Sequence, residues 1–450
     1  MFIRLEFMTD NVTYTKNERY GSLGSVLFGH FADGFDLVLI SYLFSPLALY
    51  FTGNPHDLAP ITVALTISLV FSAFGGLLFG WVADRYGRKV GLMLSIGIFG
   101  VTTLATAGVT QLWQLYTLRA IEGLGIGGEW GIGFAQISEV WSSKTRATGG
   151  GLLQSVFIIG SIVGALTAGI AITALGFGNP LSWRYSFVVA GVIGLVGVPV
   201  VKFVLPESKQ WLEYNRKRKA GELPKDYDVR SPIIQVLLNK DYRRYAWFAL
   251  LIGGANLFIY FSYASFMPTL LVVGYGLTQS IGYLINQFTL ILVLGQAIAV
   301  PFYVLNGWAA DKFGRKSTAI VFGAFYLVSV IAFMYTVIAH ISYAGLIMFP
   351  LFYAYTFVSI GQGVSAEYGV WYSEHFPTKM RSTATNFGYM VGRGVAGGSA
   401  PLVIPFLYGA LGGIAHLGMA MAIAMLVGAV VQLVGYFGLK ETKGTEITSL

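Results

Sequence analysis

The chain has 450 residues, of which 55% are hydrophobic and 11% are charged. Soluble globular proteins carry roughly 25% charged residues, so this composition excludes a soluble domain and predicts an all-α integral membrane protein with many spans. The absence of cysteine excludes disulfides and thiolate metal sites, and the net charge of +8 has to be placed along the chain before it indicates any partner.

Residues 1–22 are polar and lack the short apolar core of a signal peptide, which predicts a cytosolic N-terminal tail. Apolar stretches of about 20 residues or more follow, bounded by short polar or Gly/Pro-rich turns, and each is long enough to cross a bilayer as a helix. The twelve predicted spans are residues 23–50, 60–82, 90–109, 112–138, 149–175, 185–205, 244–274, 279–309, 317–338, 343–372, 383–408 and 414–438.

The basic residues are distributed unevenly between the two sides of these spans. All but Arg119, Arg184 and Arg393 of the 29 Lys and Arg residues lie in the tails or near the turns after the second, fourth, sixth, eighth and tenth spans. Because basic turns stay in the cytosol, this predicts a multi-pass plasma-membrane protein with both termini cytosolic. Topology thus accounts for the positive charge, and we expect a lipid bilayer and no nucleic acid as partner.

One long, charged connection divides the chain. Residues 206–243 separate an N-terminal half of six spans, residues 23–205, from a C-terminal half of six spans, residues 244–438, and residues 439–450 form a cytosolic C-terminal tail.

The two halves repeat each other. "GWVADRYGRK" (Gly80–Lys89) and "GWAADKFGRK" (Gly307–Lys316) are identical at seven of ten positions, each after the second span of its half. A second pattern, S-E-x4-K-x-R-x-T, occurs at Ser138–Thr148 and again at Ser373–Thr383. Two homologous six-helix halves with a substrate site between them are typical of transporters.

The repeated turn motif has a physical logic. Gly80 and Gly307 allow two helices to approach closely, and Asp84 and Asp311 stand at the start of a turn, where a carboxylate can cap the N-terminus of a neighbouring helix.

The arginines of the motif need partners. Arg88 and Arg315 can reach carboxylates at the cytosolic ends of other spans, and Glu139 and Glu374 are the candidates. Such pairs would hold the inner face shut and break when it opens. The alternative is that the cluster only anchors the topology.

The motif G-x3-D-[RK]-x-G-[RK]-[RK], whose basic second position is Arg85, resembles the signature of the major facilitator superfamily. "PES" (206–208) and "KETKG" (440–444) resemble motifs of its sugar-porter-like branches. The resemblance covers essentially the whole chain and implies the major facilitator fold, with a cytoplasmic charge network in each half. In the N-terminal half the network would contain Asp84, Arg88, Glu139, Arg146 and Glu207. Its C-terminal counterpart would contain Asp311, Arg315, Glu374 and Arg381.

Few charges remain inside the spans, and each costs about 2.5–3.5 kcal/mol at mid-bilayer, so each is expected to face the interior and to be functional. The bases within the spans are Arg119 and Arg393. The acids are Asp33, Asp36, Glu122, Glu129 and Glu367, and His30 is the histidine among the predicted spans.

Helical periodicity places these groups on two polar stripes. On the first span Asp33 and Asp36 lie about 60° apart, with His30 on the same face. On the fourth span Arg119, Glu122 and Glu129 fall within about 80° of arc.

Facing stripes would hold several carboxylates near one arginine in a partly desolvated pocket, where opposing influences on a carboxyl pKa allow proton exchange. We therefore predict proton coupling by Asp33, Asp36, Glu129 and Glu122, with Asp33 as the favoured carrier. The alternative for Asp36 and Glu122 is a structural ion pair.

Substrate-binding candidates lie in both halves. Two arginines, Arg119 and Arg393, suit a carboxylate substrate held by charge-assisted hydrogen bonds, and Asn386 and Tyr389 share the face of Arg393. The alternative is that Arg393 pairs with Glu367 or with an acid across the interface. Further amides and phenols could bind substrate hydroxyls or join helices, namely Gln154, Asn256, Tyr260, Tyr263, Gln296 and Gln362.

Two further motifs, "DGFD" in the first span and R-x3-G-x3-GGE from Arg119 to Glu129, resemble those of proton-coupled organic-acid symporters, which include aromatic-acid, sialic-acid and monocarboxylate carriers. The resemblance implies secondary active symport of a small organic anion with a proton by alternating access, by a monomer. A neutral sugar or polyol symporter is the alternative, and a channel or sensor is a third. With no nucleophile–base pair or metal-ligand cluster in the sequence, we expect neither an enzyme nor a cofactor beyond the coupling proton.

Overall fold

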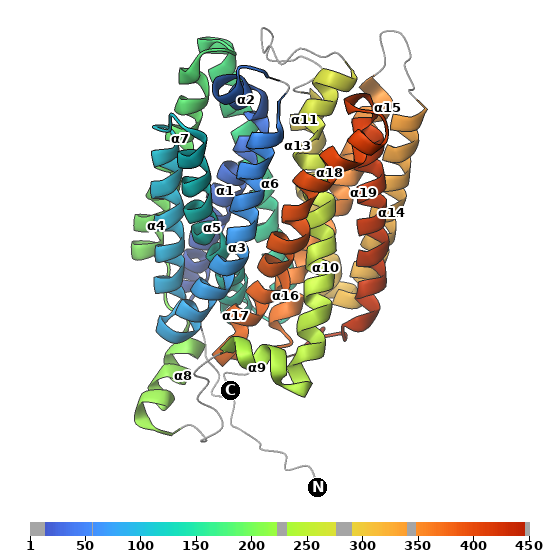
Figure 1. The fold of residues 1–450 in the computed structure, drawn as a ribbon. Coiled ribbons are helices and arrows are strands. Elements are labelled where there is room, and N and C mark those ends of the chain that lie inside the picture. Colours follow the sequence, from blue (N-terminus) through green and yellow to red (C-terminus); the bar gives the residue numbers. More distant parts are fainter. Residues whose placement is uncertain (1–13, 56, 223–231, 276–289, 340–347, 446–450) are drawn as a thin grey trace.

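The computed structural model describes residues 14–55, 57–222, 232–275, 290–339 and 348–445. These residues form a helical bundle without strands, as predicted (Figure 1). Ten of the described helices are long and apolar enough to cross a membrane. The fourth predicted span is α5, which is more polar, and the tenth is broken into shorter helices, so the bundle agrees with a twelve-span fold.

The N-terminal group of helices lies on one side of the bundle and the C-terminal group on the other (Figure 1). The N-terminal group comprises α1 (Lys16–Tyr42), α2 (Phe44–Thr52), α3 (Ala59–Tyr86), α4 (Arg88–Thr106), α5 (Leu112–Val140), α6 (Arg146–Leu175) and α7 (Pro180–Val204).

Two shorter helices, α8 (Lys209–Ala220) and α9 (Pro232–Leu238), lie at one end of the bundle, here called the α8 end (Figure 1). The C-terminal group comprises α10 (Lys240–Ala264), α11 (Met267–Thr269), η2 (Leu270–Gly274), η3 (Leu290–Leu294), α13 (Gly295–Phe313), α14 (Arg315–Ile338), α15 (Met348–Gly361), η4 (Gln362–Glu367), α16 (Tyr368–Ser373), η5 (Thr378–Met380), α17 (Arg381–Asn386), η6 (Phe387–Val391), η7 (Arg393–Gly397), α18 (Gly398–Ala410), η8 (Ile414–His416), α19 (Leu417–Gly435) and η9 (Tyr436–Gly438).

The first predicted span is two helices in the structure. α1 ends at Tyr42 and α2 begins at Phe44. Pro46 accounts for the break, because its ring would clash with the carbonyl of residue 42 in a continuous helix and it has no N–H to donate.

The turns of the repeated motif need glycine. Gly87 and Gly314 have φ of 115° and 107°, a region that other residues adopt only with strain. A Cβ atom on either would also collide with a carboxylate, that of Glu207 or Glu441. Each glycine thus lets a long helix reverse direction while a carboxylate packs against the turn.

The glycine-rich part of α5 packs directly on α3. A Cβ atom at Gly123 or Gly127 would collide with the main-chain carbonyl of Ser68 or Ser72. Small residues allow membrane helices to approach this closely. The contact brings the polar stripe of α5 into the interior.

The last spans carry irregular turns next to the bundle centre. η4 is a 3₁₀ stretch, whereas η6 and η7 are π-helical. π-helical turns frequently occur at functional sites, because the widened turn changes the direction in which side chains project.

Candidate functional site

Two clusters of buried charges join the halves at the α8 end. The first end cluster consists of Asp84, Arg88, Glu139 and Arg381. Arg88 donates from Nε and Nη2 to both oxygens of Glu139, at 3.2 and 2.8 Å, and from Nη1 to Asp84 at 2.9 Å. The predicted pair between Arg88 and Glu139 is therefore present, in the two-pronged geometry that gives strong charge-assisted bonds.

The second end cluster repeats the first with Asp311, Arg315, Glu374 and Arg146. Arg315 donates to both oxygens of Glu374, at 3.2 and 3.0 Å, and its Nη1 lies 3.1 Å from Asp311. Each cluster has two carboxylates and two guanidinium groups, so its buried charges balance, which is the condition under which buried ions are tolerated.

The remaining two arginines cross between the halves, which corrects the networks that the resemblance implied. Arg381 donates to Glu139 at 2.6 Å, and Arg146 donates to Glu374 at 3.1 Å. Each arginine begins a helix, α17 or α6, whose N-terminus rests on the opposite half. Arg146 therefore belongs with the C-terminal motif and Arg381 with the N-terminal one.

The two motif aspartates cap these same helices. Asp84 accepts from the N–H groups of Ser382 and Thr383 at 3.2 and 2.9 Å. Asp311 accepts from the N–H of Thr148 at 2.8 Å. A carboxylate at a helix N-terminus satisfies unpaired N–H groups and interacts favourably with the helix dipole.

Two glutamates hold the helix starts that follow the glycine turns. Glu207 accepts from the N–H groups of Arg88 and Lys89 at 2.9 and 3.2 Å. Glu441 accepts from the N–H of Arg315 at 2.9 Å. Sequence reasoning missed Glu441, although "KETKG" occupies the position after the last span that "PES" occupies after the sixth.

Not every motif residue contributes to these clusters. Arg85 is exposed, and no ion pair links its side chain to either end cluster among the described residues.

His375 lies next to Glu374, between α16 and η5. Its ring packs against Tyr245 with 4.6 Å between ring centroids, and Nδ1 donates to the carbonyl of Trp371 at 2.7 Å. Burial lowers the pKa of His375 below its ordinary value near 6.5. The closed arrangement of the α8 end therefore favours the neutral imidazole.

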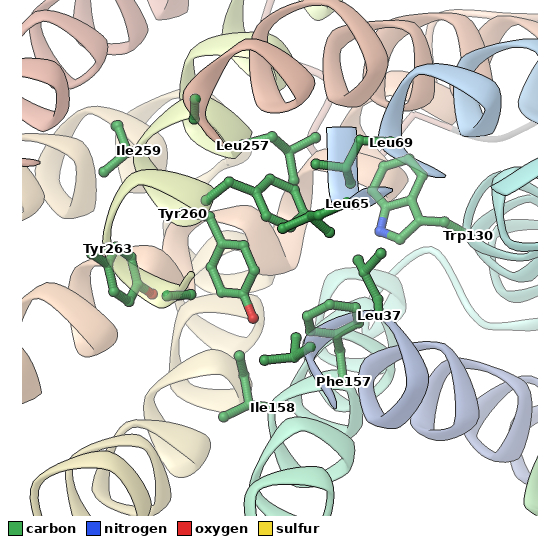
Figure 2. Packing of buried hydrophobic residues seen from close by; sticks show 14 of the residues in the cluster. Leu37, Leu65, Leu69, Trp130, Phe157, Ile158, Leu257, Ile259, Tyr260 and Tyr263 are labelled. Atoms are coloured by element: carbon green, nitrogen blue, oxygen red, sulfur yellow. The ribbon is translucent and has the colours of Figure 1, made fainter. Parts of the chain in front are cut away.

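A narrow cavity of about 20 Å³ lies between the halves. Figure 2 shows part of its apolar wall, where Trp130, Phe157, Ile158, Leu257 and Tyr260 converge from different helices. The lining residues are His30, Asp33, Trp130, Gln154, Phe157, Ile158, Leu257, Tyr260, Phe261, Tyr303, Gln362, Tyr389 and Arg393. Such a wall, largely aromatic with a few polar groups, is typical of a small-molecule site.

An ion pair crosses the cavity from one half to the other. Nη2 of Arg393, on η7, donates to Oδ1 of Asp33, on α1, at 3.3 Å. Both side chains are almost fully buried. The second oxygen of Asp33 and Nε of Arg393 have no hydrogen-bond partner among the described residues. The sequence left two acidic partners open for Arg393, namely Glu367 or an acid across the interface. The structure shows the second, because the partner is Asp33 of the other half.

A histidine links Asp33 to a second carboxylate. Nδ1 of His30 lies 2.9 Å from Oε2 of Glu129 and 3.9 Å from Oδ2 of Asp33. The three ligand atoms lie within 4.8 Å of one another, close enough to surround a cation. The 2.9 Å contact is a hydrogen bond between the imidazole and the carboxylate of Glu129.

Two aromatic rings from different halves stack at the cavity wall. The rings of Trp130 and Tyr389 are 3.8 Å apart and nearly parallel, with an angle of 9° between them. Nε1 of Trp130 donates to Gln154 at 3.0 Å. The indole is thereby fixed in orientation beside Glu129.

The remaining charges of the two polar stripes form a separate group, the Arg119 cluster, consisting of Asp36, Arg119 and Glu122. Arg119 lies 3.8 Å from Asp36 and 3.4 Å from Glu122. Asp36 also accepts from Thr103 at 2.8 Å, and Glu122 from Ser68 at 2.5 Å. All of these groups belong to the N-terminal helices and are buried.

The sequence matches the model of a known protein family over most of its length. The family model described as Major Facilitator Superfamily matches residues 26–401. The chain belongs to the major facilitator superfamily.

Relatives within this superfamily are similar over most of their length. A Cupriavidus pinatubonensis protein named a probable 4-methylmuconolactone transporter is 29% identical over 93% of this chain and 90% of its own. The cis,cis-muconate transport protein of Acinetobacter baylyi is 29% identical over 86% of this chain and 87% of its own. The major facilitator chain described here is thus a membrane transporter rather than an enzyme, similar to carriers of organic acids.

A solved structure matches the whole bundle. The proton:xylose symporter XylE superposes with a TM-score of 0.76 over 96% of this chain and 98% of its own, at 17% sequence identity. At that identity the likeness establishes the shared fold alone.

Half of the predicted substrate-binding residues of this major facilitator protein line the cavity. They are Gln154, Tyr260, Gln362, Tyr389 and Arg393. The other half lie elsewhere in the interior. They are Arg119, Asn256, Tyr263, Gln296 and Asn386.

These five residues have partners within the protein. Arg119 lies between two carboxylates of its own half. Asn256 donates to Gln362 at 3.2 Å, while Gln296 donates to the hydroxyl of Tyr355 at 2.9 Å.

Asn386 and Tyr263 also contact other parts of the protein. Asn386 accepts from the N–H of Gly131 at 3.0 Å and so joins the halves. The ring of Tyr263 packs against the ring of Tyr260 with 5.5 Å between centroids.

Sequence reasoning predicted Tyr260 and Tyr389 but missed the other aromatic residues of the cavity wall. Trp130 follows Glu129 directly, so a polar stripe on α5 could have drawn attention to it. No comparable signal in one sequence distinguishes Phe157, Phe261 or Tyr303 from the many aromatic residues that pack against lipid.

Proposed function

We propose that this transporter carries a small organic anion together with a proton across the cytoplasmic membrane by alternating access. Two kinds of observation support the proposal. Relatives over most of the chain are named as carriers of muconate and 4-methylmuconolactone. The cavity combines an aromatic wall with one arginine that has a single carboxylate partner.

The ion pair between Asp33 and Arg393 carries the proposal. A substrate carboxylate can replace Asp33 on the guanidinium of Arg393, because both groups offer the same acceptor geometry. The displaced Asp33 would then be a buried carboxylate without a cation, which is unfavourable. Taking up a proton removes that penalty, so binding of the anion and binding of the proton favour each other.

Charge balance gives the same result. Asp33 and Arg393 are neutral as a pair, and an entering monoanion would leave the closed cavity with one uncompensated negative charge. A buried charge without a partner is strongly disfavoured. One proton entering with the anion restores neutrality.

His30 and Glu129 extend the proton site. His30 hydrogen-bonds to Glu129 at 2.9 Å and lies 3.9 Å from Asp33. A proton can therefore be shared between two carboxyl groups on α1 and α5 through the imidazole. We assign coupling to Asp33 first and to Glu129 as its partner.

Asp36 and Glu122 remain a second candidate for proton coupling. Two carboxylates share the single cation of Arg119, so the Arg119 cluster has one acid in excess. A proton bound there would neutralise the excess. The cluster lies within one half, and its titration would act on the halves indirectly, through the orientation of α1.

The two end clusters would form the inner gate. They hold the halves together at the α8 end through the pairs Arg381–Glu139 and Arg146–Glu374. Rocking of residues 23–205 against residues 244–438 would break the crossed bonds of Arg146 and Arg381 and expose the cavity. We place this end in the cytosol with both termini, because it holds the basic turns. Each chain contains a complete cavity and gate, so we propose that it works as a monomer.

A transport assay in liposomes containing the purified protein tests the proposal. Labelled monocarboxylates lead the panel, and xylose is the neutral comparison. The dicarboxylate cis,cis-muconate is included as a substrate that needs a second proton for charge balance. A pH gradient, acid outside, drives uptake. We expect concentrative uptake of one or more carboxylates that collapses when an ionophore dissipates the gradient. Concentrative uptake of the sugar without any carboxylate would replace the proposal by the neutral-sugar alternative.

A further inference from the structure

A second hollow, of about 370 Å³, lies on the outside of the bundle between α10, η7 and α19. Every residue that lines it is apolar or glycine. Trp247, Leu251, Val395 and Val427 form its rim and are exposed. On a chain that crosses a membrane, this outer surface faces lipid hydrocarbon.

The length of the groove matches one leaflet of a bilayer. Its wall on α10 runs from Trp247 to Phe258. At 1.5 Å per residue, eleven residues of helix extend about 16 Å. The hydrocarbon core of a bilayer is about 30 Å thick, so the groove has about the depth of one acyl chain.

Three basic residues continue the same face of α10 beyond the groove. Lys240, Arg243 and Arg244 are exposed and precede Trp247 by one to two turns, toward the α8 end. At 100° per residue they lie within about 60° of Trp247 around the helix. Among the described residues none of the three forms an ion pair. The neighbouring Asp241 lies about 120° from Trp247, on another face.

We propose that this groove binds an anionic phospholipid, with one acyl chain along Trp247, Leu251 and Phe258 and the phosphate against Arg243 and Arg244. The chemistry of the surface changes from apolar to cationic at the depth where a phospholipid changes from acyl chain to headgroup. Tryptophan is enriched at that boundary, and clustered basic residues next to a span attract anionic lipids.

The lipid would contact the outer side of a turn that also serves the cavity. Gly392, Val395 and Ala396 form one wall of the groove, while Arg393 on the same π-helical turn reaches Asp33 inside. The bound acyl chain therefore fills the space behind the turn that positions Arg393.

Native mass spectrometry of the full-length protein tests the site. The protein is released from nanodiscs of phosphatidylglycerol and phosphatidylcholine with identical acyl chains, and the retained lipids are counted. Two variants address the two parts of the site separately: Arg243→Gln with Arg244→Gln removes the cations, and Val427→Trp fills the groove. Lys219→Gln with Lys312→Gln removes two exposed cations elsewhere at the α8 end and is the matched control.

We expect retained phosphatidylglycerol in the unaltered protein and in the control. Loss of the two arginines should lower it roughly tenfold or more without changing phosphatidylcholine, because basic residues near the surface attract anionic headgroups. Val427→Trp should lower retention of both lipids. Equal retention of phosphatidylglycerol in all four proteins, each monodisperse and folded by its melting transition, would overturn the proposal. So would a dimer that Val427→Trp dissociates without changing the lipid count, since the groove would then be a contact between two copies.

Discussion

Asp33 and Arg393 lie 3.3 Å apart across the central cavity, and their contact joins an N-terminal helix to a C-terminal one. Oδ2 of Asp33 and Nε of Arg393 have no hydrogen-bond partner in the part of the chain that the structure describes. A ligand that competes for Arg393 therefore changes both the charge state of Asp33 and the contact between the halves.

Replacing Arg393 should weaken anion binding. Hydrogen bonds to charged groups contribute about 1.5–3 kcal/mol, so Arg393→Ala should lower the affinity for the transported carboxylate about 10- to 100-fold. Arg393→Lys keeps the charge but loses the planar geometry, so its affinity should lie between that of the unaltered protein and that of Arg393→Ala. Isothermal titration calorimetry on purified protein measures all three. An unchanged affinity in Arg393→Ala would remove this residue from the binding site.

Asp33→Asn should separate binding from coupling. If a proton on Asp33 accompanies the anion, the affinity of the unaltered protein should rise on acidification, by at most about tenfold per pH unit for one proton. The variant should bind with little pH dependence and should exchange anion across the membrane without concentrating it. Uptake against a gradient by the variant would show that another group carries the proton, and Glu129→Gln would be examined next.

Glu139→Gln should shift the protein toward an open α8 end. The change leaves Arg88 and Arg381 buried without their shared carboxylate, and loss of one partner of a buried ion pair costs about 3–5 kcal/mol. The chain has no cysteine, so a spin label reacts only with cysteines that are introduced. Tyr86→Cys and Phe313→Cys place two labels at exposed positions at the ends of α3 and α13. Spin-label distances between them should lengthen.

The matched control for the gate is Glu213→Gln. Glu213 is an acid of α8 whose ion pairs, with Arg216 and Lys217, stay within that helix. Its removal should leave the spin-label distances unchanged. Equal distances in Glu139→Gln and the control would argue against a gating role for the first end cluster.

His375 should make the closed α8 end sensitive to acid. Because burial lowers its pKa, an exposed or unfolded His375 binds a proton at a higher pH than the buried one. Well above the ordinary pKa near 6.5, His375 is neutral in both states and does not change the stability of the closed state. As pH falls through that value, the exposed imidazole binds a proton and the closed state loses stability.

The variant His375→Asn isolates this effect. Between pH of about 7.5 and about 5.5, the melting temperature of the unaltered protein should fall more than that of the variant. Parallel curves would show that the imidazole is not exposed on unfolding or opening.

Arg119→Gln should damage the fold rather than the substrate site. The Arg119 cluster would then hold two buried carboxylates without a cation, at a cost of about 3–5 kcal/mol. Glu122→Gln, which removes the excess acid, should be tolerated. Yields of monodisperse protein and melting temperatures compare the two, and anion affinity in Glu122→Gln should equal that of the unaltered protein. If Arg119→Gln lowered the affinity for the anion without lowering the melting temperature, Arg119 would belong to the binding site.

Local pattern was sufficient to predict the helical class, the repeat and the partners of Arg88 and Arg315. Those contacts follow from motif positions that both halves contain. Periodicity also showed that Asp33 and Asp36 belong to polar faces. It could not show that Asp36 turns toward Arg119 while Asp33 turns toward Arg393, because an angular difference of about 60° on one helix is enough to separate two neighbours in space.

Contacts between the halves were harder to predict. Arg146 and Arg381 cross to the opposite motif because α6 and α17 start at the interface, and a sequence does not state which helix N-terminus rests on which half. Most of the aromatic wall was missed for a related reason. Tyr303 and Phe157 have the same sequence context as lipid-facing rings, and only the packing of α13 and α6 turns them inward.

The crossed arginines bear on how such a chain could arise. Under the pseudo-twofold relation of the halves, Arg146 corresponds to Arg381 and Glu139 to Glu374, and each arginine meets the glutamate of the other half. Ser138 meets its own counterpart, Ser373. Reciprocal contacts around a self-paired residue are what the interface of a symmetric dimer requires. Two separate six-helix chains of this sequence pattern would already have formed these reciprocal contacts as a dimer. Fusion into one chain then needed a linker and no new contacts at the α8 end.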